Sequence, residues 1–155
     1  MDNLTTRGKT ELGISRLLHA PLELVWEVWT KPEHVKNWWG PAGFTNTISK
    51  MDFIVGGEWI FVMHGPDGKN FDNKHLFKEI LPMSKIVMSH ESSPKFTMTI
   101  TFERQGENTL LNIHSKFESA EELKQVIELF NADRGMIEHV DRLGAYLGKL
   151  STKPN

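Results

Sequence analysis

The spacing of apolar residues changes twice along the chain, and this change constrains the fold more than any other feature. Between residues 22 and 29, four apolar side chains recur three to four positions apart, which places them on one face of a helix. From residue 43 to 118 the period falls to two, as in β-strands with one buried face. From residue 119 to about 148 the helical period returns. This order predicts an α+β protein.

Turn and capping residues divide these stretches into individual elements. A strand is expected at Glu11–Leu18, where apolar residues roughly alternate. Two short helices follow, the first begun by Pro21 and the second capped by Thr30. About six strands joined by short turns then predict an antiparallel meander. One long helix closes the chain, capped by Ser119 and locally bent at Gly135.

Composition limits the class of protein. A chain of 155 residues suits one domain, expected to span residues 1–155 with loose ends at 1–8 and 151–155. The formal net charge of −2 gives no electrostatic reason to bind nucleic acid or an anionic membrane. The absence of cysteine excludes disulfides and thiolate metal sites. The longest apolar run, Trp59–Met63, is too short for membrane insertion, and no signal peptide is recognised, so a cytoplasmic location is expected.

The predicted sheet raises the question of what fills its concave face. A twisted antiparallel sheet curls toward its apolar side, and one helix about 10–12 Å across does not fill a wide concavity. Bulky side chains can complete a solid core, or a ligand can occupy a central cavity, and the alternation leaves both interpretations open. The candidate cavity residues are large apolar side chains of the inner face and the helices: Trp38, Trp39, Trp59, Phe61, Met63, Phe77, Met88, Met98, Ile100, Phe117, Phe130 and Met136.

Three local features each allow a functional and a structural interpretation. The adjacent indoles of the Trp38–Pro41 segment can form the rim of a pocket, or one of them can anchor the core. Gly56-Gly57 allows a bend or a close approach of a ligand. Arg16 shares the inward phase of its strand, so it recognises a substrate or needs a carboxylate partner, for which Glu79 and Asp52 are candidates.

Few titratable side chains are expected on the inner face of the central strands, namely His75, Glu79 and His90. They are satisfied structural groups, or they orient a ligand's hydroxyl or carbonyl, or His75 and Glu79 act as an acid–base pair. No catalytic residue, metal site or cofactor is assigned, since nothing fixes a metal geometry and the usual catalytic and phosphate-binding motifs are absent. The remaining histidines are expected at exposed or helix-edge positions without a role: His19, His34, His64, His114 and His139.

Residues 20–41, APLELVWEVWTKPEHVKNWWGP, resemble the opening motif of the heat-shock protein 90 ATPase activator homologue-like family. Residues 51–63, 65–68 and 141–147 match further motifs in the same order. The resemblance implies the helix-grip fold of the START-related, pollen-allergen-like superfamily: a curved antiparallel sheet of six to seven strands around a long C-terminal helix, with a cavity between them. The chain departs from the pattern at Ile54, where relatives commonly carry Arg, and at Met136, where they often carry Trp.

The resemblance implies a module that binds a small hydrophobic, lipid-like or aromatic molecule in the cavity. One alternative is an enzyme similar to polyketide cyclases and aromatases, which use the same cavity. Another is a co-chaperone that stimulates a heat-shock ATPase, although in the named activators that role involves an additional domain, for which this chain is expected to have no room. A homodimer stays open. Met136 in place of Trp is expected to enlarge or reshape the cavity.

Overall fold

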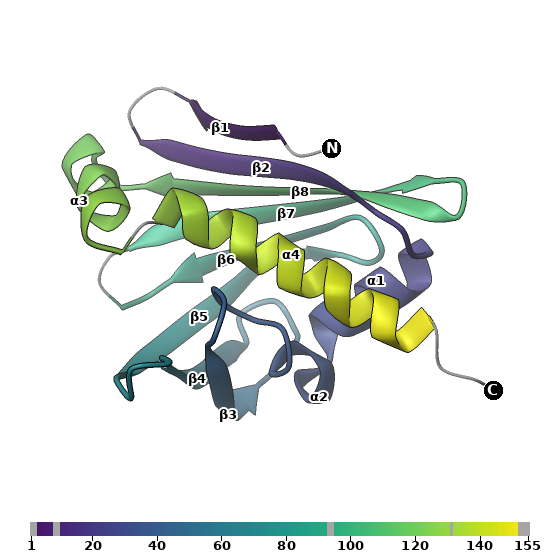
Figure 1. Cartoon of the computed structure of the whole chain (residues 1–155), viewed down its shortest axis with the longest axis horizontal. Helices are drawn as coiled ribbons and strands as arrows, with labels where there is room; N and C mark the ends of the chain where they lie inside the picture. The colour runs from purple at the N-terminus through teal and green to yellow at the C-terminus, as the bar shows by residue number, and fades with distance from the viewer. Residues whose placement is uncertain (1–2, 8–9, 93–94, 131, 152–155) are drawn as a thin grey trace.

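The computed structural model describes residues 3–7, 10–92, 95–130 and 132–151. The expected α+β order is confirmed in this part of the chain (Figure 1). The strands are β1 (Asn3–Arg7), β2 (Glu11–Leu18), β3 (Thr45–Met51), β4 (Glu58–His64), β5 (Asn70–Leu81), β6 (Lys85–His90), β7 (Phe96–Gln105) and β8 (Asn108–Phe117). The helices are α1 (Leu22–Thr30), α2 (Pro32–Val35), α3 (Ala120–Phe130) and α4 (Ala132–Ser151).

The described strands form one antiparallel sheet in the order β1-β2-β8-β7-β6-β5-β4-β3. Helix α4 runs across one face of this sheet, with α1 and α2 near its C-terminal end and α3 beside the opposite end (Figure 1). This is the helix-grip arrangement that the resemblance implied. None of the helices in the described part of the chain is long and apolar enough to cross a membrane.

The core follows directly from the period of two in the strands. In β8 every second side chain is buried, from Thr109 to Phe117. Most residues that pair with these positions across β7 and β6 are buried as well, among them Ile100 of β7 and Ile86 of β6. Val140, Leu143 and Leu147 of α4 recur at helical spacing and complete the same core. The apolar pattern therefore places α4 over the inner face of the sheet.

The N-terminal strand β1 was not expected, because residues 1–8 are read as a loose end from the sequence. The backbone of β1 pairs with β2, from Asn3 opposite Ser15 to Arg7 opposite Glu11. The described sheet has eight strands, one or two more than the six to seven that were predicted. A five-residue edge strand rich in polar residues carries little apolar alternation, so its pairing depends on the neighbouring strand.

The C-terminal part of the chain holds two helices, α3 ending at Phe130 and α4 beginning at Ala132, whereas a single helix bent at Gly135 was expected. Ser119 caps α3 as expected, since its Oγ accepts a hydrogen bond from the Glu122 backbone N–H at 3.1 Å. Gly135 lies inside α4, and a Cβ at this position would lie 3.5 Å from the ring of Pro41. That distance is an ordinary van der Waals contact, so the position faces the Pro41 turn but has room for a Cβ.

The capping box expected at Thr30 is absent. The Thr30 hydroxyl donates back to the carbonyl of Trp26 at 2.9 Å, so it bonds within α1 instead of capping the next helix. Helix α2 begins after Lys31, which has an extended backbone, and Pro32 occupies the first turn.

Gly56 and Gly57 form a tight turn between β3 and β4 that pairs with β5. The backbone N–H of Gly56 donates to the Phe77 carbonyl at 2.8 Å, and the Phe77 N–H donates to the Gly57 carbonyl at 3.0 Å. A Cβ on Gly57 would lie 2.0 Å from the backbone oxygen of Asp52, while Gly56 has a φ of +85° and open space around its Cα. The bend interpretation of the glycine pair is confirmed.

The two glycines give a matched test of this turn. We expect Gly57→Ala to lower the free energy of unfolding by at least about 3 kcal/mol, because its Cβ meets backbone that cannot rotate away. Gly56→Ala meets only the strain of a positive φ, about 1 kcal/mol. Urea unfolding of both variants measures the difference, and equal losses would contradict this account.

Candidate ligand pocket

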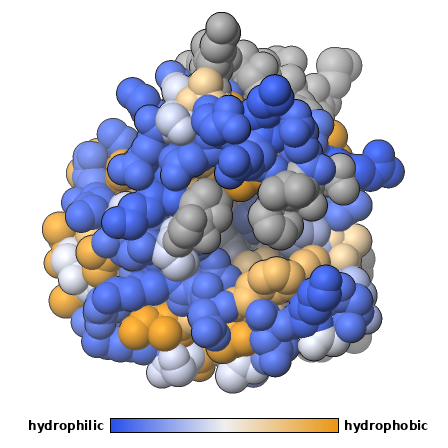
Figure 2. All heavy atoms as spheres, turned by 90° about the vertical axis from the view of Figure 1, so that its left-hand side faces the viewer, coloured by the Kyte–Doolittle hydropathy of each residue, from blue (hydrophilic) through white to orange (hydrophobic). Residues whose placement is uncertain are grey.

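A pocket of about 300 Å³ lies between the concave face of the sheet, the turn after α2 and the first half of α4. It is partly open to solvent, and Val126 of α3 is among its lining residues. Figure 2 looks onto the end of the molecule that carries α3, where apolar surface appears among hydrophilic side chains. The lining residues are Leu12, Trp39, Gly40, Pro41, Met63, Asn73, His75, His90, Phe96, Met98, Ile113, Ser115, Phe117, Val126, Gly135, Met136 and His139. A hollow of about 550 Å³ across the ends of β6 to β8 is lined mainly by polar and charged side chains such as Lys95 and Lys116.

The structure divides the candidate cavity residues into two groups. Five of the apolar candidates line the pocket: Trp39, Met63, Met98, Phe117 and Met136. Six are buried in the core away from the pocket lining: Trp38, Trp59, Phe61, Phe77, Met88 and Ile100. The side chain of Phe130 lies outside the described residues. Solid packing and a cavity therefore coexist, the first toward α1 and the second toward α3.

The two adjacent indoles have different positions. Trp38 is 0% exposed and donates its Nε1–H to the Val28 carbonyl at 3.1 Å, which anchors the turn in the core. Trp39 faces the pocket and packs edge-on against Trp59, with ring centroids 4.6 Å apart. One indole thus fixes the segment while the other forms pocket wall.

Glu79 does not face the pocket, contrary to expectation. The register of β5 against β6 shifts between Phe77 and Glu79, so Phe77 pairs with Met88 while Glu79 pairs with Val87. A β-bulge adds one residue to one strand, which moves the following side chains to the opposite face. The Glu79 side chain is 45% exposed and pairs with Lys85 at 3.4 Å. The proposed His75–Glu79 acid–base pair is therefore not formed.

His75 and His90 face each other across β5 and β6 on the inner side of the sheet, with ring centroids 5.1 Å apart. His90 Nε2 lies 2.7 Å from Asn73 Oδ1, also in the pocket wall. His75 is 2% exposed, and its Nδ1 has no hydrogen-bond partner among the described residues. Burial, and then the neighbouring His90, hold the pKa of His75 well below 6.5, so its imidazole is neutral at pH 7.

His139 is one of the pocket residues that sequence reasoning missed, because it was placed at an exposed or helix-edge position. It is 8% exposed and stacks on Trp38, with ring centroids 5.2 Å apart. Burial, and then the nearby Arg142, lower the pKa of His139 to about 3. Its Nε2 has no partner among the described residues. The signal was available: Met136, Val140 and Leu143 follow helical spacing, and position 139 falls within that buried stripe.

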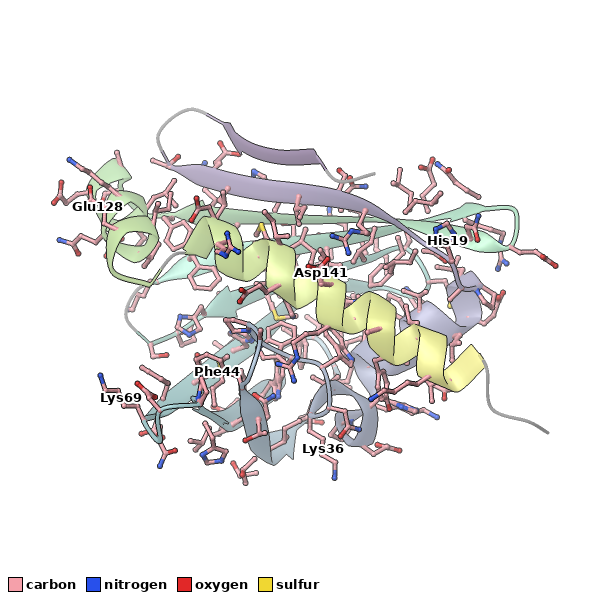
Figure 3. All side chains as sticks on the ribbon, viewed as in Figure 1. His19, Lys36, Phe44, Lys69, Glu128 and Asp141 are labelled. Atoms are coloured by element: carbon pink, nitrogen blue, oxygen red, sulfur yellow. The ribbon has the colours of Figure 1, made fainter. Side chains whose placement is uncertain are left out.

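The other histidines lie away from the pocket lining. His19 is exposed at the end of the molecule opposite α3 (Figure 3). His34 is less exposed than expected, since its Nδ1 lies 2.6 Å from the Tyr146 hydroxyl and its Nε2 lies 3.2 Å from Glu27. His64 contacts Thr47 and Asn70, and His114 contacts Glu11. Among the described residues, no three His, Cys, Asp or Glu side chains are placed to hold a metal ion.

Arg16 forms its ion pair with Asp141 of α4, at 2.7 Å, rather than with Glu79 or Asp52. Asp141, labelled in Figure 3, lies near the middle of α4. The pair joins β2 to α4 outside the lining of the 300 Å³ pocket.

The comparisons with known proteins agree with this architecture. Residues 19–148 match the family model described as activator of Hsp90 ATPase homolog 1-like protein. The chain belongs to this family. The resemblance inferred from residues 20–41 is thereby confirmed, and membership is consistent with the START-related helix-grip superfamily. A comparison with curated proteins finds no significant match.

Solved structures of similar proteins share the fold of this member of the family. A solution structure of a protein from Arthrobacter aurescens is 23% identical with a TM-score of 0.88, over 95% of this chain and 91% of that chain. A crystal structure from Mycobacterium smegmatis is 21% identical with a TM-score of 0.85, over 96% and 98%. A third, from Nitrosomonas europaea, is 22% identical with a TM-score of 0.83, over 95% and 99%. At these identities the likeness shows the fold alone.

The two positions at which this family member departs from the motif pattern differ in their relation to the pocket. Ile54 is exposed in the turn between β3 and β4 and does not line the pocket. Met136 lies on α4 in the pocket wall. Only the second departure can alter the shape of the cavity directly.

Helix α4 also holds the turn that forms one wall. Arg142 Nη1 lies within hydrogen-bond distance of three carbonyl oxygens, those of Trp39 at 3.0 Å, Gly40 at 3.2 Å and Pro41 at 2.9 Å. The next residue, Ala42, donates its backbone N–H to Glu138 at 3.1 Å. These bonds fix the pocket-lining turn to the helix that covers the sheet.

We expect Arg142→Lys to lower the free energy of unfolding by about 2 kcal/mol, since an ammonium group cannot reproduce the geometry of the guanidinium among these carbonyls. Arg134→Lys is the matched control, because Arg134 is exposed and pairs only loosely with Glu138, at 3.8 Å. Its effect is expected within about 0.5 kcal/mol. Urea unfolding of the two variants decides the point, and similar small losses would show that the turn does not depend on Arg142.

We expect His139→Phe to flatten the acid sensitivity of the fold. Below pH 6.5 the unfolded chain takes up a proton at this imidazole, whereas the folded chain does so only near pH 3, so acid favours unfolding across this window. At pH 5 this group lowers the free energy of unfolding of the wild type by about 2 kcal/mol relative to neutral pH. Unfolding at pH 7.5 and pH 5 measures the loss, with exposed His19→Phe as the control. Equal pH slopes for wild type and His139→Phe would contradict the prediction.

Proposed function

We propose that this protein binds a small, predominantly apolar or aromatic molecule in the pocket between the sheet and α4. The observation that supports the proposal most is an open hollow of about 300 Å³ on the concave face, walled mainly by apolar side chains with a few polar groups. Small-molecule sites have this composition and range from roughly 300 to 1,000 Å³. The volume lies at the lower limit, which favours a compact molecule of one or two rings over a long acyl chain.

The polar residues of the wall would orient such a molecule rather than supply most of its affinity. Five lining residues carry polar side chains: Asn73, His75, His90, Ser115 and His139. Burying about 200 Å² of apolar ligand surface contributes roughly 5 kcal/mol, against which the entropy lost on association must be set. A dissociation constant in roughly the micromolar to millimolar range is expected for a simple aromatic probe.

The two alternatives receive less support. A cyclase-like enzyme needs an acid–base pair at the ligand, and the candidate pair is separated because Glu79 lies on the outer face of β5. The lining contains no carboxylate that could replace it among the described residues. A co-chaperone role rests on the description of the family, and no contact or surface of the described residues adds to it.

Met136 provides a direct test of the binding proposal. We expect Met136→Trp to weaken binding of an aromatic probe such as 2-naphthol at least tenfold, because the larger ring occupies the pocket. Met136→Leu, which nearly conserves volume, should change the affinity less than about threefold. Ligand-observed NMR and the shift of melting temperature with probe concentration measure binding, and circular dichroism checks the fold. Undiminished binding to a folded Met136→Trp variant would place the probe elsewhere.

A further inference from the structure

Two buried imidazole nitrogens in the pocket wall lack a hydrogen-bond partner. His75 Nδ1 and His139 Nε2 have no partner among the described residues, and both residues line the pocket. Both imidazole rings pack edge-on against Trp39, whose ring centroid is 6.1 Å from that of His75 and 4.5 Å from that of His139. A buried polar atom left without a hydrogen bond is unfavourable. Both atoms have almost no accessible surface of their own, so a ligand atom supplies the bond, and gains affinity from it, when the imidazole ring turns toward the ligand.

The wall of the pocket carries no fixed charge. The described lining residues include no lysine, arginine, aspartate or glutamate. Arg142 is the cationic side chain that acts on the His139 imidazole, and its Nη1 is directed at the carbonyls of the Trp39–Pro41 turn. His90 of β6 is the titratable group that faces His75. A carboxylate in this pocket would have no cation to compensate for its lost hydration.

The chemistry of a neutral imidazole favours one ligand group over others. Burial keeps the pKa of both rings low, so each carries one N–H donor and one acceptor lone pair near pH 7. A ligand carbonyl can satisfy only a nitrogen that bears the proton, and a carboxylate likewise only accepts. A hydroxyl both donates and accepts, so it can satisfy the unpartnered nitrogen in either tautomer.

We propose that the ligand is a neutral hydroxylated aromatic molecule, whose hydroxyl hydrogen-bonds to His75 or His139, and that the pocket rejects the corresponding carboxylates. This inference rests on the proposed function, since it specifies the ligand class of the same pocket. It adds a basis for selectivity that the apolar wall alone does not provide.

Three probes of similar shape test the inference by NMR titration and thermal shift: 2-naphthol, naphthalene and 2-naphthoate. At pH 7.5 we expect 2-naphthol to bind at least about tenfold more tightly than either of the others. Between pH 7.5 and 5.5 the affinity of 2-naphthoate should rise by up to tenfold per pH unit as its carboxyl takes up a proton, while that of 2-naphthol stays constant. A carboxylate that binds as tightly as the phenol at pH 7.5 would overturn the inference.

The variants His75→Phe and His139→Phe assign the selectivity to the two rings, because Phe keeps an aromatic ring and removes the nitrogens. At least one of them should lower the affinity for 2-naphthol about tenfold and leave that for naphthalene within about threefold. If neither does, the double variant decides, and an unchanged preference for 2-naphthol there overturns the inference. Naphthalene binding without a preference for 2-naphthol refutes the inference and leaves the binding function standing. If none of the three probes binds, both the inference and the proposed binding function are refuted.

Discussion

The geometry of the whole inner side depends on how the aromatic rings of α1 and of the turn after α2 pack beneath α4. The ring centroids of Trp29 and Trp38 lie 4.8 Å apart. The ring centroid of His139 in α4 lies 5.2 Å from that of Trp38 and 4.5 Å from that of Trp39. Aromatic pairs at such distances gain from edge and stacking interactions beyond their buried area. The cluster sets the height of α4 over the sheet at one end, and the space left toward the other end becomes the pocket.

The fold was largely predictable because its main elements are encoded locally. The alternation in β7 and β8 and the helical stripes of α1 and α4 are each visible within a few residues. The features that escaped prediction depend on partners distant in sequence. Strand β1 is specified by pairing with β2, and the partner of Arg16 is Asp141, more than a hundred positions away. The shift at Glu79 comes from one extra residue in β5, which the alternating pattern does not reveal.

The candidate site was predictable to a smaller extent, for a related reason. Alternation identifies which side chains face inward, but a pocket is the volume that those side chains fail to reach. Trp59 and Trp39 both lie on the inner side, yet only Trp39 lines the pocket, because the position of α4 and the turn decides which ring is covered. His139 was not expected in the pocket because histidine is polar and was assigned to an exposed or helix-edge position. The helical spacing, which places position 139 in a buried stripe, indicated its burial more reliably than the polarity of its side chain.

The buried histidines connect the stability of the protein to its proposed role. An apolar ring at position 75 or 139 would satisfy the surrounding aromatic cluster without leaving a polar atom unpaired, so the imidazoles make the empty fold less stable than it could be. Both residues face the same pocket, and the charged groups Arg16 and Glu79 lie outside its lining. Local departures from optimal packing are expected where a site needs a specific chemical group. A ligand that bonds to these nitrogens would offset the cost of burying them unpaired, so it would stabilise the folded chain as it binds, through one pair of side chains.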